Sequence, residues 1–187
     1  MKNLVLVFMV MLFTLPMVGQ EFEVTPNGLK DKTNLENDFV VIDTPGKTAT
    51  ELYQRAIEYI NETYKNPEEV IKGNTENEYL RFNTHVSGIG ILKNSGVKVI
   101  TNANYVTELR FKDGKVRYEI NSLEIYTDTS PRQNVSFSGK GWSYYIYNSK
   151  KGTLKQPDLK ELTELHFNST VTSLTTFLMG ETKTEDW

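Results

Sequence analysis

The strongest constraint on the fold is a β-hairpin signal at Asp113-Gly114, which separates two runs of alternating apolar and polar residues. Asp-Gly favours a type I′ turn, in which both central residues have positive φ and two strands are joined directly. The turn predicts three apolar-face pairs across the hairpin: Phe111 with Val116, Leu109 with Tyr118 and Thr107 with Ile120. Burial of this face fixes the register, because a slip of one residue would turn every side chain to the other face.

The other face of the predicted hairpin is charged. The same register puts Arg110 opposite Arg117 and Glu108 opposite Glu119. Directly facing charges repel each other, whereas diagonal Arg-Glu neighbours attract. We interpret this pattern as a solvated face and not as a functional site.

Helices are predicted on both sides of the hairpin. Residues 48–51 (Thr-Ala-Thr-Glu) have the form of a capping box, and the apolar spacing that follows predicts a helix up to Asn66-Pro67. Pro157-Asp158 begins a second helix, which Gly180 is expected to end. The apolar run 39–42 is predicted to be a central strand, and residues 88–96 a loop. These elements predict one α+β domain, a twisted antiparallel sheet backed by two helices.

The N-terminus has the pattern of an export signal. Lys2 precedes an uncharged apolar run, residues 4–18, and polarity returns after Gly19. This run is shorter than a membrane-spanning helix, so we predict a signal peptide over residues 1–19 that is cleaved near Gly19/Gln20. An uncleaved anchor is the alternative. The predicted mature protein is periplasmic or secreted, with an arm (20–37), a single domain (38–180) and a polar tail (181–187).

Several of these features together resemble one family of exported bacterial proteins. They are the strand at 39–42, the Leu52-Tyr53 and Ala56 positions of the first helix, the Lys-Asp-Gly-Lys-Val-Arg-Tyr hairpin at 112–118, and the C-terminal helix. The sequence is similar to the DUF4468 family of Bacteroidetes-type proteins, described as having a fold like that of the TATA-binding protein (TBP-like). The resemblance implies a helix-backed antiparallel sheet and an exported location. It carries over no catalytic residue.

Composition excludes several kinds of chemistry. The chain has no cysteine, so it has no thiol nucleophile, disulfide or cysteine-ligated metal. Its formal net charge of -3 gives no reason to expect nucleic-acid binding. His85 and His166 lie far apart without the spacing of a metal motif, and we interpret both as structural. We therefore expect no cofactor, no metal site and no catalytic residue.

Two functions remain open from the sequence. The first is a non-enzymatic binding or assembly module of the cell envelope, with a protein or glycan partner. The second is a hydrolase, for example a glycan-directed one, whose carboxylates converge only in the fold. For a binding module, we place the ligand surface on the aromatic run Trp142, Tyr144, Tyr145 and Tyr147, because a single core cannot bury both faces of one strand. Coverage of the second face by the helices or by the N-terminal arm is the structural alternative.

Overall fold

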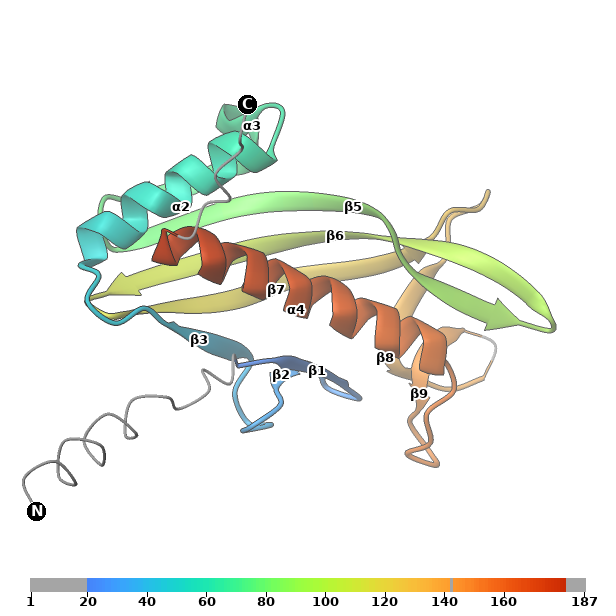
Figure 1. Ribbon diagram of the computed structural model, residues 1–187. Coiled ribbons are helices and arrows are strands. Elements are labelled where there is room, and N and C mark those ends of the chain that lie inside the picture. Colours follow the sequence, from blue (N-terminus) through green and yellow to red (C-terminus); the bar gives the residue numbers. More distant parts are fainter. Residues whose placement is uncertain (1–19, 142, 181–187) are drawn as a thin grey trace, which may run out of the picture.

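The computed structural model describes residues 20–141 and 143–180 of the protein (Figure 1). The strands are β1 (Phe22–Thr25), β2 (Gly28–Asp31), β3 (Phe39–Asp43), β4 (Ile71–Thr75), β5 (Tyr79–Asn94), β6 (Val97–Lys112), β7 (Lys115–Thr127), β8 (Asn134–Gly139) and β9 (Tyr144–Asn148). The helices are α2 (Ala49–Thr63), α3 (Pro67–Val70) and α4 (Pro157–Met179). The predicted signal peptide, the polar tail and Trp142 lie outside the described residues. No described helix is long and apolar enough to cross a membrane.

Seven strands form the main sheet, in the order β4-β5-β6-β7-β8-β9, with β3 paired to β7. β5 and β6 have 16 residues each and run the length of the molecule (Figure 1). β1 and β2 form a separate two-stranded sheet. The predicted α+β fold with a largely antiparallel sheet is confirmed, although β8 and β9 are parallel.

The predicted hairpin is confirmed in register but not in turn type. β6 and β7 pair as expected, with Leu109 opposite Tyr118. Of the two central turn residues only Gly114 has a positive φ, +77°, so the turn is not type I′. Asp113 instead turns toward α2, where its Oδ1 accepts a hydrogen bond from the backbone N–H of Ala49 at 2.8 Å. Contact with the start of the helix therefore sets the conformation of this turn.

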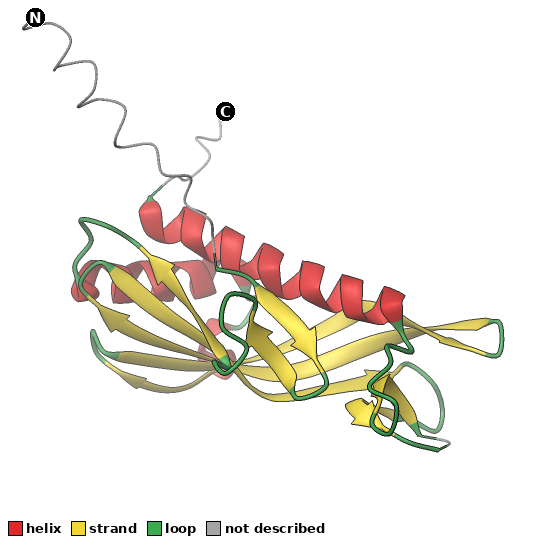
Figure 2. Ribbon diagram, turned by 90° about the horizontal axis from the view of Figure 1, so that it is seen from below, coloured by secondary structure: helices red, strands yellow, loops and turns green. Residues whose placement is uncertain are grey.

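Both long helices, α2 and α4, lie on one side of the sheet (Figure 2).

The ends of these helices follow the sequence prediction. The predicted capping box is confirmed, because Thr48 and Glu51 each accept the backbone N–H of the other. The hydrogen bond from the Thr48 N–H also lowers the pKa of Glu51. α4 ends at Gly180, whose φ of +82° is the left-handed conformation expected there. The short helix α3 was not predicted. Pro67 was expected only to stop the preceding helix, but it is also the first residue of α3.

The core lies between this face of the sheet and the two helices. Its largest fully buried side chains come from every layer, among them Phe22, Leu52, Ile60, Leu80, Leu109, Tyr118, Phe167 and Leu174. The apolar face of α4 packs on the core, but Leu165 is 60% exposed. Thr163 is buried on that face instead.

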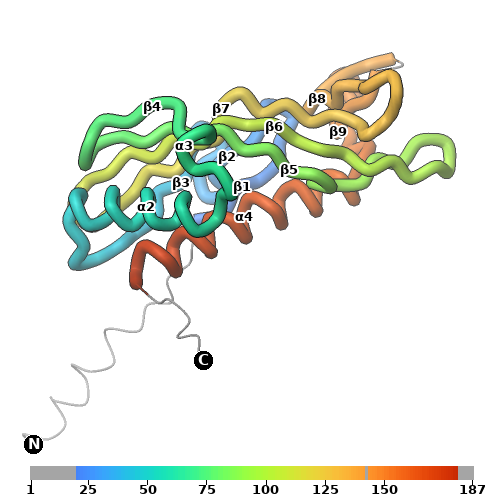
Figure 3. The backbone as a smooth tube through the Cα atoms, turned by 90° about the horizontal axis from the view of Figure 1, so that it is seen from above, coloured from blue at the N-terminus to red at the C-terminus, as the bar shows by residue number. Residues whose placement is uncertain are grey.

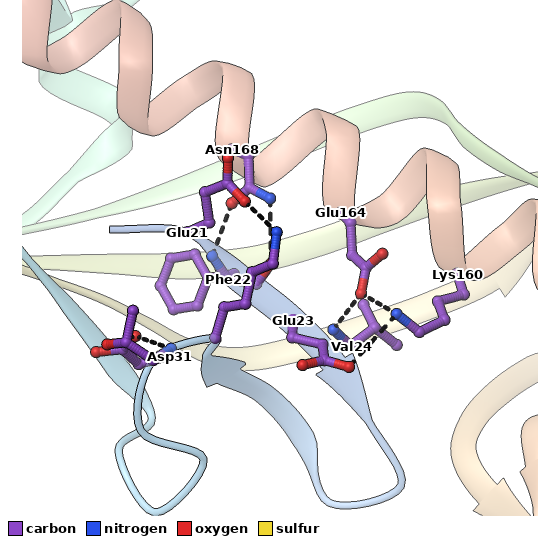
Figure 4. Close-up of polar contacts among 10 residues, drawn as sticks. Glu21, Phe22, Glu23, Val24, Asp31, Lys160, Glu164 and Asn168 are labelled. Atoms are coloured by element: carbon purple, nitrogen blue, oxygen red, sulfur yellow. Dashed lines mark hydrogen bonds and ion pairs between the residues drawn. The ribbon is translucent and has the colours of Figure 1, made fainter. Parts of the chain in front are cut away.

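The predicted N-terminal arm is part of this core. Phe22 and Val24 of β1 are fully buried. The side chain of Asn168 bonds both the N–H and the C=O of Phe22, at 2.7 and 3.1 Å, and Glu164 accepts the N–H of Val24 at 2.8 Å (Figure 4). Side chains of α4 thus occupy the edge of β1 where another strand could otherwise pair.

Three details of the sequence interpretation are wrong. β3 is not central: it pairs with β7 alone, and only Val40 and Ile42 are fully buried. Residues 88–94 are strand and not loop, since β5 continues through a bulge between Val86 and Gly90. Glycines in this segment serve the bulge, so they concealed the strand pattern. Finally, the aromatic run forms β9, which pairs with β8 in parallel and not in the predicted antiparallel arrangement.

Candidate functional site

A cleft of about 470 Å³ opens at the end of the sheet where the β5–β6 turn, β9 and the start of α4 meet. We call it the distal cleft. Figure 3 shows these elements gathered at one end of the molecule. The cleft is lined by Lys93, Asn94 and Ser95 of the β5–β6 turn, by Gly141, Ser143, Tyr144 and Tyr145, and by Lys155 and Gln156.

Side chains before and within α4 hold the β5–β6 turn in place. The Gln156 amide accepts the N–H of Lys93 and donates to its C=O, both at 2.9 Å, as a neighbouring strand would. The Nζ of Lys93 lies 2.6 Å from Oδ2 of Asp158, and this hydrogen bond lowers the pKa of Asp158. The wall of the cleft is therefore fixed by specific polar contacts at the start of α4.

The predicted aromatic residues separate into two groups. Tyr144 and Tyr145 line the distal cleft and are half-buried. The hydroxyl of Tyr144 accepts a hydrogen bond from Asn94 Nδ2 at 3.2 Å. Tyr145 packs closely over Gly139, where an added Cβ would come within 2.8 Å of its ring. The cleft therefore presents two tyrosine side chains beside amide and hydroxyl groups.

Tyr147 has a different position. Its hydroxyl donates to the C=O of Val24 at 2.8 Å, which ties β9 to the N-terminal hairpin, and burial raises its pKa. The structural alternative for the second face of this strand therefore holds for Tyr147. Trp142, the fourth predicted residue, lies outside the described residues.

The uncovered face of the sheet carries a second polar cluster, around His85. Its Nδ1 lies 2.9 Å from Oδ1 of Asn104 and 3.4 Å from the hydroxyl of Tyr126, and its Nε2 lies 3.3 Å from Oγ of Ser87. All are polar contacts of an exposed side chain. The sequence pattern gave no sign of this grouping, because Asn104 comes from the neighbouring strand.

The predicted charged face is organised by arginine. Glu108 and Glu119 are paired across β6 and β7 and are only 16% and 15% exposed. Arg117 bonds Glu119 at 2.6 Å, while Arg110 and Arg81 lie 3.7 and 3.8 Å from Glu108. The two carboxylates are thus held by cations and are less solvated than the sequence suggested. The arginine–glutamate pairs therefore form between neighbours on the same strand and between directly opposite residues of β5 and β6. They do not form along the predicted diagonals.

Two other hollows flank α2. One, of about 470 Å³, lies between α2 and α4 and includes Tyr59, Leu162 and His166. There His166 Nε2 lies 3.0 Å from the Tyr105 hydroxyl, and burial lowers the pKa of His166 and raises that of Tyr105. The other, of about 720 Å³, lies beside β4 and includes Tyr53 and Glu76. Neither contains any of the predicted site residues.

Comparison with known proteins relates the central part of the chain to one protein family. Residues 39–126 match the family model of a domain of unknown function, DUF4468, with a TBP-like fold. The chain contains a DUF4468 domain. A crystal structure of a DUF4468 family protein from Bacteroides ovatus is similar over 79% of this chain and 87% of that one, with 14% identity and a TM-score of 0.50. A TBP-like protein from Parabacteroides distasonis is similar over 75% and 90% of the two chains, with 12% identity and a TM-score of 0.54. No curated protein matches this chain.

The DUF4468 match and the distal cleft overlap only in part. The match ends at Tyr126, so it includes the β5–β6 turn but not Tyr144, Tyr145 or Lys155. Among the described residues, no three His, Asp or Glu side chains gather as they would around a metal ion. The candidate site is therefore a cleft between the DUF4468 domain and the C-terminal segment that packs on it.

Proposed function

We propose that this protein is an exported, non-enzymatic module of the bacterial envelope that binds a glycan in the distal cleft. One observation carries the proposal: Tyr144 and Tyr145 line a cleft together with the side chains of Asn94, Ser143 and Gln156. Tyrosine offers a flat apolar ring with a polar end, which suits the mixed surface of a sugar. Amide and hydroxyl groups supply both donors and acceptors for sugar hydroxyls. The signal-like segment at residues 1–19 supports an exported location.

Affinity electrophoresis of the full chain through gels containing individual polysaccharides tests this function. We expect at least one polysaccharide to retard the wild-type protein, and Tyr145→Ala to abolish the retardation without unfolding the protein. Tyr79→Ala is the matched control, because Tyr79 is also half-buried but lies at the opposite end of β5. If Tyr145→Ala is retarded as strongly as the wild type, the glycan does not bind in the distal cleft. Binding to no polysaccharide, with Tyr145-dependent capture of an envelope protein, would replace the glycan by a protein partner.

Hydrolysis is a second candidate function, favoured by the contacts of His85. With the proton on Nδ1 and donated to Asn104, Nε2 is free to accept the proton of the Ser87 hydroxyl. This is the order of nucleophile, base and orienting group found in serine hydrolases. None of the three hollows described above includes His85 or Ser87, so binding in the distal cleft is the better supported function. Labelling of the wild type, but not of Ser87→Ala, by a fluorophosphonate would show that Ser87 is an activated nucleophile, and absence of labelling would exclude hydrolysis that depends on Ser87.

A further inference from the structure

Charge is strongly segregated along this chain. Residues 87–104 and 128–156, which make up most of the end of the molecule around the distal cleft, contain seven basic residues and one acidic residue, and the acidic residues Glu124 and Asp158 border these ranges. The rest of the sequence contains 14 basic and 23 acidic residues. A near-neutral total therefore conceals a basic end on an otherwise acidic molecule, and such a field attracts anions toward one place.

Most of these basic groups have no acidic partner of their own. The described ion pairs neutralise Lys93 through Asp158 and Arg132 through Glu124. The other five basic residues of this end form no ion pair with a described residue, and all are exposed: Lys98, Lys140, Lys150, Lys151 and Lys155. Their charge is available to a ligand.

Two lysines of this end lie at the cleft itself, and a third lies beside one of them. Lys155 and Lys93 line it, and Lys98 stands directly opposite Lys93 in the β5–β6 register. Like charges that face each other across two strands are destabilising. Asp158 pairs with Lys93, and Lys98 has no such partner among the described residues. An anion bound beside Lys98 would reduce the repulsion.

We infer that the ligand of the distal cleft is an acidic polysaccharide, whose carboxylate or sulfate groups meet Lys93, Lys98 and Lys155 while its hydroxyls meet the uncharged lining. This inference rests on the proposed function and adds the charge of the ligand to it. An acidic glycan fits better than a nucleic acid, because the cleft is lined by amide and hydroxyl side chains as well as by two lysines.

Polygalacturonate and its fully methyl-esterified form are suitable probes, because they share one backbone and differ in charge. We expect the full chain to bind polygalacturonate in affinity electrophoresis, to lose that binding as salt is raised from 50 to 500 mM, and to bind the ester at least tenfold more weakly. The double variant Lys98→Gln/Lys155→Gln should bind polygalacturonate roughly fivefold more weakly than the wild type, from two exposed ion pairs. Lys65→Gln/Lys72→Gln is the control with the same change of charge, since these exposed lysines lie near α3 and β4, away from the cleft.

The outcomes separate this inference from the function on which it rests. Equal binding of both forms, lost in Tyr145→Ala, would overturn the acidic ligand and leave glycan binding standing. Equal weakening by the two lysine pairs would show a general charge effect and would also overturn it. Binding of single-stranded DNA as tight as that of polygalacturonate, with the same dependence on Lys98 and Lys155, would overturn the assignment to a glycan.

Discussion

The two turns of the long β5-β6-β7 ribbon are built differently. At the β6–β7 turn, Asp113 caps α2, while the N–H of Gly114 donates to Lys47 and its C=O accepts from Thr44, both at 2.8 Å. At the β5–β6 turn, Ser95 and Gly96 both have positive φ, +49° and +84°, as a type I′ turn requires. The turn whose two central residues form no hydrogen bond to a described helix follows the backbone preference of a two-residue hairpin, and the turn in which Asp113 bonds α2 departs from it.

The ends of the molecule differ in packing as well as in turn geometry. Near the β6–β7 turn, Leu109 and Phe111 are buried beneath α2. Near the β5–β6 turn, Val97 and Ile100 are 62% and 57% exposed. The end at the β6–β7 turn therefore contributes mainly to stability. The end at the β5–β6 turn has exposed apolar and charged side chains that could contact a ligand.

The largest expected effect is a contrast in core packing between these ends. Leu109→Ala should lower the free energy of unfolding by about 3 kcal/mol, because it removes a fully buried side chain and leaves a cavity. Val97→Ala should change it by less than about 0.5 kcal/mol, because this side chain is mostly exposed. Urea denaturation of both variants measures the difference. Similar losses would mean that Val97 is covered in solution.

Local chemistry explains why the β6–β7 end was predictable. The Asp-Gly pair, the alternation on either side of it and the capping box at Thr48 each act within a few residues, and together they determine a hairpin and a helix. The distal end depends on contacts between remote segments. Gln156 completes the edge of β5 at Lys93, and Tyr147 bonds Val24, a residue more than 120 positions away. No local pattern reports such pairings.

The same distinction applies to the candidate site. The aromatic run indicated where unusual side chains concentrate, and Tyr144 and Tyr145 do line the distal cleft. The position of Lys93 at the cleft could not be predicted, because the glycine-rich segment 88–96 indicates a loop. Lys98 lies opposite Lys93 only because β5 and β6 pair in this register, which the sequence did not indicate.

The second prediction compares the glycines of the two turns. Gly114→Val should lower the free energy of unfolding by at least about 1 kcal/mol, because a β-branched residue resists a φ of +77°. Gly96→Val meets the same restriction at +84° but disturbs no contact with another element, so its loss should be smaller. The control is Gly73→Val, where φ is ordinary and no atom lies within 4 Å of the added Cβ. Denaturant melts in which Gly96→Val loses more than Gly114→Val would contradict the comparison.

The third prediction concerns the contact between the β6–β7 turn and α2. Asp113→Ala should lower the free energy of unfolding by about 1 kcal/mol, because it leaves the N–H of Ala49 without its acceptor. Asp113→Asn retains an acceptor oxygen and should lose less. Thermal and urea melts of the three proteins provide the test. Equal loss in both variants would show that charge at the start of α2, and not the hydrogen bond, is what Asp113 supplies.

The smallest expected effect is a gain of stability at the β5–β6 turn. Ser95 adopts a φ of +49°, which asparagine tolerates better than serine, and Asn-Gly is a preferred type I′ pair. Ser95→Asn should therefore raise the free energy of unfolding by about 0.5 kcal/mol. Asp113→Asn creates the same dipeptide at the other turn but should bring no such gain, because Asp113 does not have a positive φ. If Asp113→Asn raised the free energy of unfolding and Ser95→Asn did not, the β6–β7 turn and not the β5–β6 turn would be type I′. Contact with α2 would then not determine the backbone conformation of Asp113.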